Sequence, residues 1–225
     1  MDGASGVAVS IDGNYVYVTS HSTGYLVTVD VHNPRSPTMV GAVPVGERTY
    51  GVAVSPDGKY AYVTGYHSDG LAVVNVSIAS NPTVVSEVTD STNIDVAAGV
   101  VLSADGHYAY VTGRFSASLV VVNVSNPHSP TVVGTTTNSM YLDGAFELAL
   151  SQDGRLAYVA SHYSNGVAVV DVNDPGNPTV IGSVNGLNTS GAHGVVVSPD
   201  GSYAYVTAFD SNGMAVVQLQ DCALH

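Results

Sequence analysis

One stretch of sequence recurs five times along this chain. In its clearest copy, residues 51–64 read GVAVSPDGKYAYVT. The Asp-Gly pair inside it stands at positions 12, 57, 105, 153 and 200, which gives repeat lengths of 45, 48, 48 and 47 residues. Repeats of this length, built from short strand-like runs, are typical of β-propellers and related arrays. This repeat therefore constrains the fold more than any other feature of the sequence.

Each complete repeat contains four apolar runs, which in the second repeat span residues 51–55, 60–64, 71–76 and 82–88. The first two runs are joined by Ser-Pro-Asp-Gly, whose residues suit a tight turn. The runs themselves are rich in Val, Tyr and Thr, which suit a pleated sheet. Four short strands joined by hairpin turns, with no helical period, predict one propeller blade per repeat. We therefore expect an all-β, five-bladed β-propeller of four-stranded antiparallel blades in a single domain, with repeats at about residues 1–45, 46–93, 94–141, 142–188 and 189–225.

The fifth repeat has only three of the four runs, so we expect the last blade to be incomplete. Its third run covers residues 214–219, and no Pro-Thr run follows it. The repeat count favours a closed five-bladed ring, and the alternative is that these blades form part of a larger ring. An incomplete blade leaves a strand edge at residues 214–219 that can pair with another chain.

The charge of the chain narrows its possible partners. Lys and Arg total 5 and Asp and Glu total 18, which gives a formal net charge of −13. Such a surface repels phosphate backbones and anionic lipids, so we expect no nucleic-acid partner. No apolar run approaches the roughly 18 residues that span a bilayer, so we expect no membrane insertion. The composition suits a secreted or cell-surface protein.

The motif SPDGxYAYVT, followed by an LxVVDV-like run, Asn-Pro and PTVVG, resembles the YVTN or LVIVD-type repeats of bacterial and archaeal surface-protein propellers. The resemblance covers nearly the whole chain. It implies the propeller fold, with the first run of each blade innermost. It implies little about function, because relatives include surface-layer proteins, lactonase-like enzymes and metal-binding oxidoreductases, and a fold does not fix a function.

We expect the variable loops to meet at one end of the propeller, here called the upper face. It carries the loops between the second and third runs and the residues that lead into each first run. Four repeats begin the first run with a glycine at the same position, whereas the fourth repeat has Glu147. A carboxylate in place of glycine is the largest departure from the repeat, and such departures often mark functional sites.

Three kinds of site are compatible with the upper face. The first is a non-catalytic binding site for a small molecule, sugar or peptide, because pockets of this kind combine rings with a few polar groups; its residues are Tyr50, Tyr66, Tyr141, Tyr163, Glu47 and Arg48. The second is a Zn, Cu or Fe site, since imidazole suits these metals; its ligands are His21, His67, His162 and His193.

The third kind is a hydrolytic or lactonase-like site. Glu147 would act with Asp95 or Asp143 as general acid and base, and Arg114 or His193 would stabilise developing negative charge. The acidic loop of residues 90–95 additionally offers oxygen ligands for Ca²⁺. The sequence favours the recognition role, with the enzyme, hydrolytic or metal-dependent, as the alternative.

Overall fold

The computed structural model describes residues 2–184 and 188–219, which form nineteen β-strands. The first two blades comprise β1 (Ala4–Val9), β2 (Tyr15–Ser20), β3 (Tyr25–Asp30), β4 (Thr38–Pro44), β5 (Thr49–Val54), β6 (Tyr60–Gly65), β7 (Gly70–Asn75) and β8 (Thr83–Thr89). Blades 3 and 4 comprise β9 (Ala97–Leu102), β10 (Tyr108–Gly113), β11 (Ser118–Asn123), β12 (Thr131–Thr137), β13 (Ala145–Leu150), β14 (Leu156–Ser161), β15 (Gly166–Asp171) and β16 (Thr179–Val184). Blade 5 comprises β17 (Ala192–Val197), β18 (Tyr203–Ala208) and β19 (Gly213–Gln218).

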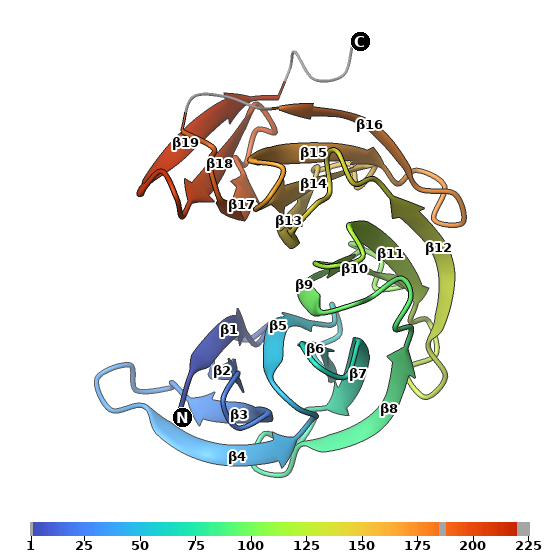
Figure 1. Ribbon diagram of the computed structural model, residues 1–225. Helices are drawn as coiled ribbons and strands as arrows, with labels where there is room; N and C mark the ends of the chain where they lie inside the picture. The colour runs from blue at the N-terminus through green and yellow to red at the C-terminus, as the bar shows by residue number, and fades with distance from the viewer. Residues whose placement is uncertain (1, 185–187, 220–225) are drawn as a thin grey trace.

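The strands of each blade pair in chain order and run antiparallel. Four sheets have four strands, and the sheet β17-β18-β19 has three. Figure 1 shows the first strand of each blade toward the centre and the fourth along the outer rim. The predicted five-bladed propeller with an incomplete last blade is therefore confirmed. In the described ranges, no helix is long and apolar enough to cross a membrane.

Neighbouring blades are joined by one repeated type of apolar contact. The face of blade 1 that carries Tyr17 packs on Ala61 and Val63 of blade 2, all of them buried. The same contact joins Tyr62 to blade 3, Tyr110 to blade 4 and Tyr158 to blade 5. A large ring on one face thus meets small aliphatic side chains on the next, and both are buried. We call this contact the blade joint.

The expected closed ring is not formed. The innermost strands pack in the order β1-β5-β9-β13-β17, but β1 and β17 do not pack against each other. Figure 1 shows the blades as an open arc with β1 and β17 at its two ends. The second strands of blades 2 to 4 (β6, β10 and β14) are largely buried, whereas β18 and β19 of blade 5 alternate between buried and exposed residues. Five blades at this spacing do not complete a circle, so blades 1 and 5 each keep one face uncovered.

Candidate functional site at the upper face

A β-bulge at the start of each innermost strand controls which side chains reach the central axis. In blade 4, Ala145 pairs with Ser161 and Leu148 pairs with Val159, so Phe146 and Glu147 together oppose the single residue Ala160. The other four blades have irregularities at the same place. Bulges bend a strand and redirect side chains, and they are frequent next to active sites. The bulge therefore explains why function can concentrate at this position of the repeat.

In blades 1 to 3 the bulge is fixed by a threonine at the end of the second strand. The Thr64 hydroxyl accepts from Gly51 N–H at 2.7 Å and donates to the Ala98 carbonyl of the next blade at 2.5 Å. Thr19 and Thr112 make the same two contacts. A Cβ at Gly51 would lie 2.6 Å from that carbonyl oxygen and 3.1 Å from Thr64 Oγ1. Only glycine fits there, and we call this arrangement the Thr-Gly bridge.

Blade 4 lacks the Thr-Gly bridge because both of its residues are changed. Glu147 replaces the glycine, and Ala160 replaces the threonine. Ala160 has no hydroxyl, which removes one of the two groups that a side chain at position 147 would meet. The two departures therefore belong together. Sequence analysis identified Glu147 but missed Ala160, although the loss of the repeated threonine was visible there.

Aromatic rings from three blades meet at the upper end of the axis. The ring of Phe146 lies 4.8 Å from that of Tyr50 and 3.8 Å from the imidazole of His193, measured between centroids. Tyr50 also lies 6.4 Å from Tyr66. The equivalent residue of blade 3 is Ala98, whose short side chain takes little room. We call this group, together with Arg114 and Glu147, the mouth cluster.

Arg114, in the loop after β10, is held between two tyrosine hydroxyls. Its guanidinium donates to the hydroxyl oxygen of Tyr66 at 3.1 Å and to that of Tyr163 at 3.3 Å. Its Cζ lies 5.3 Å from the centre of the Phe146 ring and 5.5 Å from that of Tyr163. Among the described residues Arg114 forms no ion pair, and its buried Nε has no hydrogen-bond partner. In a protein with a net charge of −13, this leaves a positive charge free for an anionic ligand.

Because they accept from Arg114, both tyrosine hydroxyls keep their own protons available. Tyr66 and Tyr163 can therefore donate to the same anion that the guanidinium attracts. Arg114 and these two residues form a set of donors suited to a carboxylate or an oxyanion. Sequence analysis placed Arg114 in one site and the tyrosines in another, whereas the structure brings them together.

The electrostatics of the mouth cluster perturb three of its groups. Burial raises the pKa of Glu147. Burial, followed by the nearby charges of His162 and Arg114, lowers the pKa of His193. Burial and the neighbouring Glu147 carboxylate raise the pKa of Tyr50 to about 12, against the opposing effect of Arg114. Shifted groups gathered at one mouth are frequent at functional sites.

The four candidate metal ligands are separated into different environments. His21 packs edge-on against Tyr66 at 5.2 Å, and its pKa is lowered by burial and then by Arg48 and His67. His162 Nε2 lies 3.9 Å from an Asp210 carboxylate oxygen, and His193 stacks on Phe146. Across residues 2–184 and 188–219, no three His, Cys, Asp or Glu side chains are arranged to hold a metal ion. The structure therefore does not bring the four histidines together as ligands.

The remaining candidates line the loops around the mouth cluster. The backbone carbonyls of Asp95, Asp143 and Glu47 accept from the N–H groups of the loop opposite each of them. The raised pKa of Glu147 has burial as its cause, with no contribution from a second carboxylate. Arg48 is exposed, whereas Tyr141 packs at the edge of the core between blades 3 and 4.

The candidate calcium loop holds its first carboxylate through local bonds. Asp90 accepts from the backbone N–H groups of Thr92 and Asn93 and from the Asn93 side chain. These bonds account for a turn that caps the loop. The loop is therefore stabilised by its own groups.

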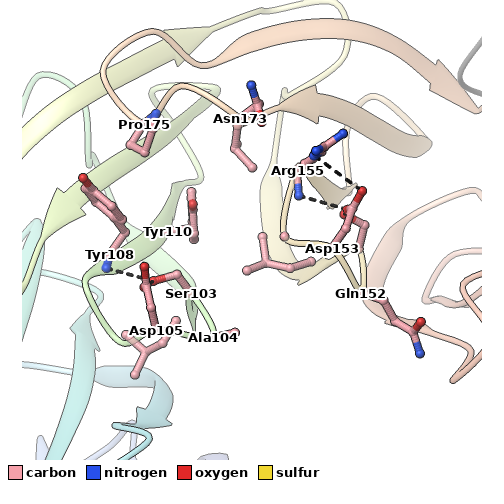
Figure 2. Close-up of a pocket in the computed structure, with 15 residues that line it drawn as sticks. Ser103, Ala104, Asp105, Tyr108, Tyr110, Gln152, Asp153, Arg155, Asn173 and Pro175 are labelled. Carbon is pink, nitrogen blue, oxygen red and sulfur yellow. Dashed lines mark hydrogen bonds and ion pairs between the residues drawn. The ribbon is translucent and has the colours of Figure 1, made fainter.

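The opposite face contains grooves at the blade joints. One groove between blades 3 and 4 has a volume of about 540 Å³. Asp105, Tyr108 and Asp153 are among its lining residues (Figure 2). Similar hollows lie between blades 2 and 3 and between blades 1 and 2. Each turn aspartate accepts from a serine two residues earlier; for Asp105 the Ser103 hydroxyl lies at 2.5 Å. These grooves recur with the repeat, and their carboxylates are used within the turns.

The sequence of this chain matches two families. Residues 52–176, more than half of the chain, match the family described as lactonase, 7-bladed β-propeller. The chain belongs to the seven-bladed β-propeller lactonase family. Residues 3–45 also match the LVIVD repeat family, as the resemblance implied. A search of curated proteins gives no match.

Solved structures with the same fold include members named as lactonases. The periplasmic gluconolactonase of Pseudomonas aeruginosa is 21% identical with a TM-score of 0.81, covering 96% of this chain and 66% of that one. A putative 6-phosphogluconolactonase of Bacteroides uniformis is 20% identical with a TM-score of 0.79, covering 95% and 66%. A protein of unknown function from Desulfotomaculum acetoxidans is 19% identical with a TM-score of 0.77, covering 96% and 69%. This lactonase-family chain thus spans about two thirds of the length of these structures.

Proposed function

We propose that this protein hydrolyses a lactone of a sugar acid at the mouth cluster. The observation that carries the proposal is Arg114, which holds two tyrosine hydroxyls and has no carboxylate partner among the described residues. Glu147 stands where the repeat requires glycine, and both Glu147 and Arg114 act electrostatically on Tyr50 of the same mouth cluster. Membership of the lactonase family, and the names of the gluconolactonases that share the fold, support this reaction class.

The reaction joins water to the lactone carbonyl carbon and breaks the ring C–O bond. Glu147 in its ionised form would remove a proton from the attacking water, and its raised pKa strengthens it as a base. The oxyanion that forms on the carbonyl oxygen would lie against Arg114 and the hydroxyls of Tyr66 and Tyr163. When the ring bond breaks, Glu147 returns its proton to the departing alkoxide. The product is a hydroxy acid, whose carboxylate faces the same donors.

The rings of the mouth cluster would position the sugar-derived part of the substrate. Tyr50 and His193 are partly exposed and both pack against the buried ring of Phe146, at centroid distances of 4.8 and 3.8 Å. Their rings would contact the apolar face of a sugar ring and exclude water from the reacting carbonyl. Of the tyrosines that the sequence assigned to ligand recognition, Tyr50, Tyr66 and Tyr163 would act in this site, whereas Tyr141 packs at the edge of the core between blades 3 and 4.

The test measures acid release from δ-gluconolactone and 6-phosphogluconolactone by the purified protein, with spontaneous hydrolysis subtracted. We expect turnover that falls by roughly 10² to 10⁴-fold in Glu147→Gln. Glu87→Gln, a change on the exposed strand β8, serves as the matched control and leaves the rate unchanged. Equal rates for the wild type and Glu147→Gln would contradict the proposal.

A recognition role without catalysis is the second candidate. It is favoured by the same aromatic surface beside Arg114, which suits an anionic sugar. Calorimetric binding of gluconate that depends on Arg114, in a protein with no turnover, would identify this role. The position of Glu147 in the bulge favours the hydrolase.

A further inference from the structure

The grooves on the face opposite the mouth cluster share one construction. Each is lined by both tyrosines of a second strand, by the turn aspartate of the same blade and by the turn aspartate of the next blade. Their volumes are about 340, 410 and 540 Å³ at the joints between blades 1 and 2, 2 and 3, and 3 and 4. Figure 2 shows the third, with Tyr108 and Tyr110 beside the Asp105 turn and with Asp153 on the facing wall. We call these three the lower grooves.

A buried hydroxyl without a partner belongs to each lower groove. Tyr17, Tyr62 and Tyr110 are only 2 to 3% exposed, and each lines its own groove. Among the described residues, none of their hydroxyls forms a hydrogen bond. Burial, followed by the charge of the Asp57 turn, raises the pKa of Tyr62 to about 12, which shows that this hydroxyl lies near the carboxylate. A buried hydroxyl is unfavourable unless a partner satisfies it, so these three point to a polar ligand.

The turn aspartates keep one carboxylate oxygen available for a cation. Asp57 Oδ1 accepts from the Ser55 hydroxyl and from Lys59 N–H, so the turn uses this oxygen alone. Asp57 Oδ2 lies 3.4 Å from Lys59 Nζ, in an exposed ion pair. Such pairs contribute little to stability, so an incoming cation can replace them. Two further turn aspartates place Oδ2 near a side-chain nitrogen in the same way; the pairs are Asp105 with His107 and Asp153 with Arg155.

The groove between blades 1 and 2 is the most anionic of the three. No Lys, Arg or His is among its described lining residues, and Asp12 forms no ion pair with any residue that the structure describes. Hydrogen bonds from Ser10 and Asn14 lower the pKa of Asp12 to about 2, so its carboxylate is ionised at physiological pH. Asp12 and Asp57 therefore place two negative charges on one groove.

We propose that the lower grooves bind a basic, extended peptide segment of a partner protein, with one Lys or Arg side chain in each groove. The cationic group would contact Oδ2 of the turn aspartates, and its hydrocarbon stem would pack along the tyrosine rings. Neighbouring grooves share an aspartate, either Asp57 or Asp105, so the three form a continuous series. A partner with several cationic side chains would occupy them together and gain affinity from each.

The tyrosine hydroxyls favour a peptide over a simple polyamine. A hydroxyl both accepts and donates a hydrogen bond. An ammonium group would use only its accepting side, and its proton would then need an acceptor. A peptide carbonyl supplies one, whereas a polyamine has none. The lower grooves lie on the face opposite the mouth cluster, so this proposal does not depend on lactone hydrolysis.

The experiment titrates the intact protein with a fluorescein-labelled oligolysine and follows anisotropy. The main variant carries Tyr17→Phe, Tyr62→Phe and Tyr110→Phe, which remove the hydroxyls and leave the net charge unchanged. We expect its Kd to rise by roughly tenfold or more, because the bonds to a charged group are lost. Tyr25→Phe, at a 40% exposed tyrosine outside the grooves, is the matched control and should leave the Kd unchanged. An unchanged Kd in the main variant would overturn the proposal.

Two charge-matched variants distinguish the lower grooves from general attraction to a chain of net charge −13. Asp12→Asn with Asp57→Asn removes two charges from one groove and keeps an Oδ1 acceptor for each turn. Asp2→Asn with Glu87→Gln removes the same charge from exposed positions elsewhere. We expect only the first pair to raise the Kd by roughly tenfold. Equal effects would mean that the attraction is general and the proposal is wrong.

Two further measurements complete the test. Spermine that displaces oligolysine at the same concentration of positive charge would identify a small polyamine as the ligand and overturn the choice of a peptide; weak displacement supports it. If circular dichroism shows that the triple variant does not fold, Tyr17→Phe alone gives the same comparison in the most anionic groove.

Discussion

Glu147 and Ala160 oppose each other in the bulge of blade 4, where blades 1 to 3 have a glycine and a threonine joined by hydrogen bonds. Blade 4 has lost a structural bridge and gained a carboxylate at one and the same place. This exchange of stability for a chemical group is the pattern expected of a functional site.

Restoring the bridge tests this relationship. We expect Glu147→Gly combined with Ala160→Thr to be more stable than the sum of the two single changes by about 1 kcal/mol or more, because only the pair regains both hydrogen bonds. Ala160→Thr alone should destabilise, since the new hydroxyl competes with the Glu147 side chain for space. Urea unfolding of the four proteins gives the coupling energy. Additive effects would mean that the two residues are independent.

The positive charge of Arg114 should be essential for turnover. Arg114→Met removes the guanidinium that faces the developing oxyanion, and we expect lactone hydrolysis to fall by about 10² to 10³-fold. Arg155→Met is the control, because Arg155 lies on the opposite face with its side chain 71% exposed. A lower rate and weaker gluconate binding in Arg114→Met alone would indicate a local role of this guanidinium. Equal losses in both variants would indicate a general effect of charge.

The raised pKa of Glu147 predicts opposite trends in activity and stability. The base works when ionised, so activity should appear only as the pH rises through a value above the ordinary 4.5. Because the folded pKa is raised, this group favours folding at low pH, and that contribution is lost as the pH rises through the folded pKa. Glu147→Gln should therefore be much less active and yet more stable than the wild type at neutral pH. Rate and unfolding profiles from pH 4 to 8 test both statements.

The Thr-Gly contacts should contribute different amounts of unfolding free energy in different blades. Thr64→Val leaves the buried Gly51 N–H without its acceptor, and we expect a loss of about 1–3 kcal/mol of unfolding free energy. Thr207→Val removes only the contact to Gly194 at 2.8 Å, in a strand that is partly exposed. Water can replace that contact, so the loss should be smaller. Chemical denaturation of the two variants provides the comparison.

The blades were predictable because the residues that define each turn and each strand lie close together in the sequence. The Ser-x-Asp-Gly turn supplies its own hydrogen bonds, as in the contacts of Asp57 with Ser55 at 2.6 Å and with Lys59 N–H at 3.0 Å. Alternating valines and tyrosines then define two faces for each sheet. Ring closure was predicted wrongly, because the angle between blades depends on packing across joints that no single repeat reveals. The exposure of Tyr205 is the direct sign of that difference.

The mouth cluster was predictable only in part. Glu147 stood out because it breaks the repeat, and the upper-face loops were correctly placed around it. Arg114, Tyr66 and Tyr163 lie about one repeat length apart, 48 and 49 positions, in the corresponding loops of successive blades, but the repeat does not reveal that Arg114 bonds to both neighbours. Four upper-face histidines suggested a metal, but three lie in loops and His193 lies in β17, and their rings contact different neighbours. The catalytic roles proposed for Glu147 and Arg114 stay predictions until turnover is measured.

The bulge at the head of each blade also has an evolutionary consequence. One or two residues per repeat lie in the bulge and have no regular partner in the neighbouring strand, so sheet pairing restricts their identity less. Each such position can be altered by a single point mutation while the scaffold is inherited unchanged. Duplicated, nearly identical units can in this way acquire a composite centre in which every copy contributes something different.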